Sequence, residues 1–229
     1  MNETSVLPRR AFLAGTAASG ALALAACATP YGGFSFVDAV QRLLFLSSQR
    51  AFDRMAQPGG FWDQQVAQLG LANFIGTRGD VLSRILTSAL FKSRLERSFA
   101  EMAWRASERA APVVADTIRA VGYQNAIDLI RGGPSAATLY LRSQMGNRLI
   151  DVMAPDVGEA LRVAQDPLIG QLLAAASGID IPGMAGAFSA RVNDVIWREI
   201  GNEEAVIRSD PRSTRDPVLI GVFGPGARY

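Results

Sequence analysis

Few residue types in this chain can support chemistry. The 229 residues include no His and one Cys, Cys27, and every basic residue except Lys92 is Arg. Without His there is no Ser-His-Asp or Cys-His catalysis and no His-ligated metal, and one Cys cannot build a disulfide framework or a Cys-rich metal site. Any reaction would therefore depend on carboxylates, Arg and Tyr.

Carboxylates gather near the end of a predicted C-terminal helix. Glu199 and Glu203 are four residues apart, so on a helix they share a face. Such a pair could share a metal ion or hold a proton for acid–base work. The structural alternative is a salt-bridged helix end in which Glu204 pairs with Arg208. We favour this alternative, and we expect no catalytic residue, no metal site and no cofactor.

A second cluster follows the turn at Gly132–Pro134. A helix N-terminus after a Gly pair can bind an anion, here with support from Arg142. The structural alternative, which we favour, is that the glycines end one helix, the proline starts the next, and Tyr140 forms a hydrogen bond within the core. If a buried polar site exists, we expect its residues among Glu108, Tyr140, Arg142, Glu203, Glu204 and Arg208.

The first 26 residues have the anatomy of a signal peptide, with a charged start, an apolar middle and a small-residue end. The apolar run over 11–26 is shorter than the roughly 20 residues that span a bilayer. The adjacent arginines favour the twin-arginine export route, with general secretion as the alternative. The residues that carry the export prediction are Arg9, Arg10, Phe12, Leu13, Leu24, Ala25 and Ala26.

Cys27 ends this apolar run, and the Leu-Ala-Ala-Cys sequence resembles the bacterial lipobox. We expect a lipid on Cys27 and a short tether over 27–34, rather than an accidental Cys after an ordinary signal peptide. Ala28, in place of Asp, favours the outer membrane over retention at the inner membrane. The sequence therefore predicts a lipid-anchored protein of the cell envelope that faces the periplasm.

Apolar residues in the rest of the chain recur at helical spacing and are interrupted by Gly and Pro. We predict one all-α domain over 35–229, a compact bundle of roughly seven to ten short and medium helices. Pro112 is expected to start a new helix, Pro155 to break or bend one, and 179–186 to form a loop. The predicted helices cover 36–57, 61–72, 80–110, 112–121, 126–131, 134–145, 149–164, 166–178 and 187–207, and an apolar C-terminal segment covers 219–223.

The second half of the chain contains a set of short segments whose sequence, order and spacing are those of a known family: 105–112, 126–132, 136–142, Pro155, 203–211 and 222–224. On these segments the chain resembles a bacterial family known as the domain of unknown function 4197 (DUF4197) family, with a weaker likeness over 36–99. Over 75–95 the chain departs from the family's usual Pro-containing stretch. The resemblance implies an exported, mostly helical protein, often with a lipoprotein-type signal, and implies no activity.

These observations together predict a lipid-anchored envelope protein with a structural or interaction role. A non-catalytic protein is favoured over an enzyme. The alternatives are a binding module for a lipid or small apolar ligand, and a carboxylate-dependent hydrolase of envelope polymers. Scattered charges with a net value of +2 argue against nucleic acid. The expected partners are the membrane, through the lipid on Cys27, and a protein of the envelope, with any small-molecule ligand unknown.

Overall fold

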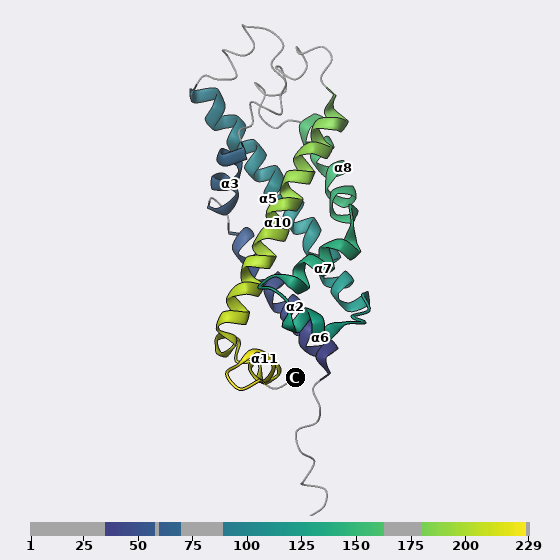
Figure 1. The fold of residues 1–229 in the computed structure, drawn as a ribbon. Coiled ribbons are helices and arrows are strands. Elements are labelled where there is room, and N and C mark those ends of the chain that lie inside the picture. Colours follow the sequence, from purple (N-terminus) through teal and green to yellow (C-terminus); the bar gives the residue numbers. More distant parts are fainter. Residues whose placement is uncertain (1–34, 58–59, 70–88, 163–179, 228–229) are drawn as a thin grey trace, which may run out of the picture. The chain divides into compact units, whose positions relative to one another are not determined.

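The computed structural model describes residues 35–57, 60–69, 89–162 and 180–227, and all regular structure in these ranges is helical (Figure 1). The prediction of an all-α fold is confirmed. The predicted signal peptide, Cys27, the tether and the predicted helix over 166–178 lie outside the described residues. So does the start of the helix predicted over 80–110. The α-helices are α2 (Phe36–Met55), α3 (Phe61–Leu69), α5 (Ala89–Ala120), α6 (Ala126–Arg131), α7 (Ala136–Met145), α8 (Arg148–Arg162), α10 (Ile181–Ser209) and α11 (Pro217–Phe223).

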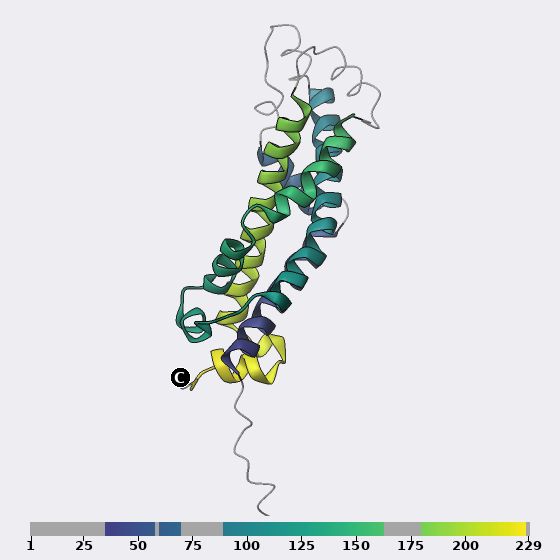
Figure 2. The ribbon, with the colours of Figure 1, turned by 90° about the vertical axis from the view of Figure 1, so that its right-hand side faces the viewer.

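Helix α10 lies at the centre of the contacts between helices. It packs most extensively against α8 and α2, and α5 in turn contacts α2, α3 and α8 (Figure 1 and Figure 2). Arg54, near the end of α2, pairs with Glu203, and Arg42, in its first half, pairs with Asp216. Helix α2 therefore runs antiparallel to α10, and its start lies near α11.

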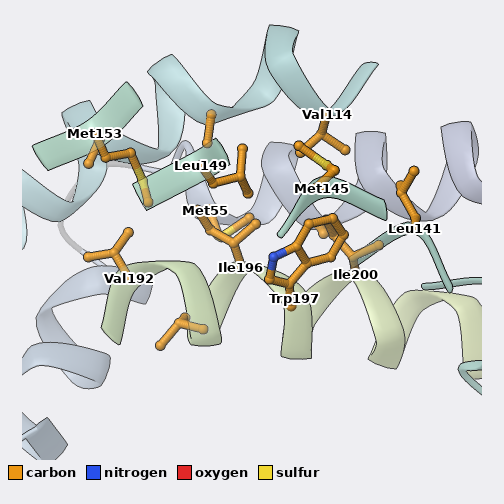
Figure 3. Packing of buried hydrophobic residues seen from close by; sticks show 14 of the residues in the cluster. Met55, Val114, Leu141, Met145, Leu149, Met153, Val192, Ile196, Trp197 and Ile200 are labelled. Atoms are coloured by element: carbon orange, nitrogen blue, oxygen red, sulfur yellow. The ribbon is translucent and has the colours of Figure 1, made fainter. Parts of the chain in front are cut away.

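The core is formed where these helices meet. Figure 3 shows apolar side chains from five helices pointing toward one another. Trp197 is buried among them, and its indole N–H donates to Asn193 Oδ1 at 2.9 Å, which satisfies a polar group inside an apolar region. The side chains shown and labelled are Met55, Val114, Leu141, Met145, Leu149, Met153, Val192, Ile196, Trp197 and Ile200.

The predicted start of a new helix at Pro112 is wrong. Helix α5 continues through Pro112, and α8 continues through Pro155, so of the predicted break or bend the break does not occur. A proline inside a helix costs about 3 kcal/mol. In α5, Ala110, Val114 and Ile118 are all fully buried, so the apolar stripe continues across the proline and packing outweighs that cost.

The predicted loop over 179–186 is also wrong, because α10 begins at Ile181. Pro182 sits in the first turn, where no backbone N–H is needed for the helix. The Asp180 side chain accepts a hydrogen bond from the Gly183 N–H at 3.0 Å and caps this end. Helix α10 ends at Ser209, two residues beyond the predicted end at 207, and the 3-10 turn Pro211–Thr214 follows it.

None of the helices in the described ranges has a stretch that is both long enough and apolar enough to cross a bilayer.

Gly201 in α10 allows the close approach of α7. A Cβ atom added there would lie 3.3 Å from Ser135 Cβ and 3.8 Å from Thr138 Cγ2. We predict that Gly201→Val lowers the free energy of unfolding by about 1–3 kcal/mol, because the added side chain pushes the two helices apart. Urea denaturation followed by circular dichroism measures this change.

Gly186, in the same helix, is the matched control, since a Cβ added there meets no atom within 4 Å. Gly186→Ala is expected to raise the free energy of unfolding by roughly 0.5–1 kcal/mol through helix propensity. A stabilising Gly201→Val would contradict the close contact.

Candidate functional site

Glu204 is the most deeply buried charged residue among the described positions, with a relative exposure of 0%. Its carboxylate accepts hydrogen bonds from the backbone N–H groups of Ala137 and Thr138 at 3.0 and 2.7 Å, and from the Thr138 hydroxyl at 2.5 Å. These N–H groups belong to the first turn of α7, where the unpaired amides carry partial positive charge. Glu204 therefore caps α7 from a different helix.

Arg208 lies one turn further along α10 and pairs with Glu204, with 2.8 Å between Nε and Oε1. Its two terminal nitrogens each donate at 2.8 Å, one to the Ile130 carbonyl and the other to the Leu129 carbonyl. Those carbonyls are at the end of α6, where the helix carries partial negative charge. The guanidinium also lies 4.8 Å from the ring centroid of Phe223 in α11, a cation–π contact.

The Glu204–Arg208 pair thus binds both sides of the turn at Gly132–Pro134. The N-terminus of α7 does bind an anion, but that anion is the chain's own Glu204 carboxylate. The arginine that supports it is Arg208. Arg142, to which the less favoured anion-site interpretation gave this role, pairs instead with Asp194 on the surface, at 2.6 Å. The α7 amides that Glu204 occupies are consequently not available to an external ligand.

The other candidate residues are not brought into this pair. The Tyr140 hydroxyl donates to the Gly122 carbonyl at 2.7 Å, and Glu108 is exposed on α5. Glu203 immediately precedes Glu204 in the sequence but points toward α2, where it pairs with Arg54. The six candidates are therefore distributed over separate contacts.

Glu203 belongs to a second carboxylate cluster, which sequence reasoning described only in part. Glu199 and Glu203 do share a face of α10, and both accept hydrogen bonds from Arg54, with 3.2 Å between Arg54 Nη1 and Glu199 Oε2. Asn202 Nδ2 donates to the other Glu199 oxygen at 3.3 Å. Arg54 was missed because it lies 145 positions away from Glu199 in the chain. The sequence feature that could have pointed to Arg54 is its place as a basic residue in the last turn of α2.

The geometry of these clusters favours packing over catalysis. Each of the three buried carboxylates among the described residues, Glu199, Glu203 and Glu204, has an arginine partner. Within the described part of the chain, no group of three or more acidic, His or Cys side chains is placed to hold a metal ion.

Tyr123 and Tyr140 form an aromatic pair beside this region, with ring centroids 5.8 Å apart. The Tyr123 hydroxyl donates to the Ile118 carbonyl at 3.1 Å. Burial, with a smaller effect of Tyr140, raises the pKa of Tyr123 from its ordinary value of 10.0 to about 12. The neutral phenol is therefore the form that the folded protein stabilises.

A family model described as "Protein of unknown function (DUF4197)" matches residues 31–224. The chain belongs to this family. The match covers the likeness in the second half and the weaker likeness over 36–99, and it includes the departure over 75–95. Every residue of the Glu204–Arg208 pair and of the Arg54 cluster lies within it. No curated protein and no solved structure matches the chain.

We predict that Glu204→Gln lowers the free energy of unfolding by about 3 kcal/mol, because it leaves Arg208 buried without a counter-charge. Asp194→Asn is the matched control, since it makes the same change in an exposed pair with Arg142. It is expected to cost less than about 1 kcal/mol. Equal losses in urea denaturation would show that Glu204 does not hold the helix ends.

The raised pKa of Tyr123 predicts a loss of stability at alkaline pH. Its contribution is fully present below pH 10, the unfolded value, and is lost as the pH rises toward about 12. Melting temperatures from pH 9 to 12 measure the effect, with tyrosinate absorbance as the titration signal. Tyr123→Phe is expected to flatten this part of the profile, and an unchanged slope would contradict the assignment.

Proposed function

We propose that this protein is a lipid-anchored, non-catalytic component of the bacterial cell envelope with a structural or interaction role. The observation that carries the proposal is Cys27, the single Cys of the chain, at the end of the Leu-Ala-Ala-Cys sequence. A lipid on Cys27 would attach the helical domain to a membrane without a spanning segment. The Ala at position 28 favours the periplasmic face of the outer membrane.

The geometry of the helical domain supports the non-catalytic part of this proposal. A general acid or base needs a carboxylate that can reach a substrate. Glu204 is enclosed and occupied by α7 amides and Arg208, so its place in the fold suits a structural role. This argues against the alternative of a carboxylate-dependent hydrolase.

The alternative of a binding module for an apolar ligand finds less support. Such a module needs an enclosed cavity lined by apolar side chains. A hollow of about 400 Å³ beside α2 is open rather than enclosed, and it is lined by Asp38, Gln41, Arg42, Phe45 and Arg119. We therefore place the interaction role first, with a protein of the envelope as partner.

Metabolic labelling with a palmitate analogue tests the anchor. The full-length chain is expected to incorporate label into the membrane fraction, and Cys27→Ser is expected to abolish it, because the thiol is the attachment point. Ser19→Ala, a change in the same segment that leaves Cys27 intact, is the matched control and is expected to keep the label. Unchanged labelling of Cys27→Ser would defeat the proposal.

A second experiment tests the interaction role. The anchored protein is cross-linked in intact cells, purified from the membrane and examined by mass spectrometry. A reproducible envelope protein at near-stoichiometric yield is the expected outcome. Turnover of envelope polymers by the purified protein, lost on Glu203→Gln, would instead establish the hydrolase.

A further inference from the structure

The first half of α2 carries a stripe of side chains that other helices cover only in part. The residues are three or four positions apart, so they lie on one face of the helix. Val37, at its start, is apolar and yet 37% exposed. The stripe consists of Val37, Asp38, Gln41, Arg42 and Phe45.

A groove of about 400 Å³ runs beside this stripe and reaches Arg119, near the end of α5. The Arg119 guanidinium lies 5.0 Å from the ring centroid of Phe45. Gln41 Nε2 contacts the Ile118 carbonyl at 3.5 Å and joins the two helices at the groove. We call the stripe together with Arg119 the groove face.

The arginines of the groove face keep donors for an external group. Arg42 donates through Nε to Asp38 at 2.9 Å and through Nη1 to Asp216 at 3.1 Å, and Arg119 donates through Nη1 to Asp116 at 2.7 Å. A guanidinium has five N–H donors, so these bonds leave several that can reach phosphate oxygens. The groove face also holds the Asp38 carboxylate, so it offers both charges, as a headgroup with phosphate and ammonium requires.

The length of the tether brings the groove face close to a membrane. Nine residue steps separate Cys27 from Phe36, which is at most about 32 Å of extended chain. Helix α5 alone, with 32 residues, is about 48 Å long. If Cys27 carries the proposed lipid, the tether keeps the start of α2 within about 32 Å of the bilayer, a distance shorter than helix α5. This argument rests on the proposed lipid at Cys27.

We propose that the groove face rests on the bilayer that holds the Cys27 lipid. Val37 enters the interface between headgroups and acyl chains, and Arg42 and Arg119 contact the phosphate groups of phospholipid headgroups. The occupant of the groove is thus a phospholipid headgroup, and the domain takes one defined orientation on the membrane.

An introduced thiol tests this orientation in the full lipidated protein. The lipid occupies the sulfur of Cys27, so Val37→Cys supplies the only reactive thiol for an environment-sensitive fluorophore. The protein is placed in vesicles of phosphatidylethanolamine and phosphatidylglycerol. The label at position 37 is expected to shift its emission to the blue and to resist quenching by iodide.

Lys92→Cys is the matched control, since its position near the start of α5 is about 39 Å along that helix from Ile118. Its label is expected to stay fully quenched by iodide. Equal quenching at both positions overturns the proposal. If the fluorophore attaches to the protein that has no introduced thiol, then Cys27 is not lipidated and the proposed anchor is wrong. This outcome differs from equal quenching at positions 37 and 92, which overturns only the proposed orientation.

Arg119→Gln in the Val37→Cys background tests the headgroup contact. Loss of one arginine near a phospholipid surface is expected to reduce the ratio of docked to undocked protein about fivefold. Arg105→Gln, which also removes an arginine paired with a neighbouring carboxylate of α5, is the control and is expected to change nothing. Circular dichroism confirms folding of each variant, and equal effects of the two changes would remove the phosphate contact from the proposal.

Discussion

The rest of the fold depends on one buried ion pair, Glu204 with Arg208. Both partners come from one turn of α10, yet each serves another helix end: the carboxylate binds the positive start of α7 and the guanidinium binds the negative end of α6. A buried pair costs desolvation energy, and the hydrogen bonds to backbone groups at both helix ends offset that cost. Helices that would otherwise expose unpaired amides and carbonyls in the interior can therefore meet at a tight turn.

Close packing and polar contacts act together around this pair. Gly201 lets α7 approach α10, and that approach brings the α7 amides within reach of Glu204. On the α2 side of the same helix, Arg54 holds Glu199 and Glu203 together, although the two carboxylates repel each other. Helix α10 thus uses consecutive acidic residues for two different neighbours, which explains why its last turns are so rich in charge.

Much of the fold follows from local patterns, whereas the site does not. Apolar spacing predicted the helices, and the spacing of Glu204 and Arg208 predicted their pair. Pro112 and Pro182 misled the prediction, because burial of Val114 in one case and the Asp180 cap in the other decide where a helix runs. The partners of Glu204 in α7 and of Glu203 in α2 are set by tertiary packing between distant segments, which one sequence without contacts does not reveal.

The distance along the chain between Arg208 and its partners has a consequence for the order of folding. Helix α6 has six residues and α7 has ten, and helices this short are marginal in isolation. The contacts that fix them span 66 to 79 positions and come from the last part of the chain. During synthesis both helices emerge long before α10, so they gain their final positions only when almost the whole chain is present.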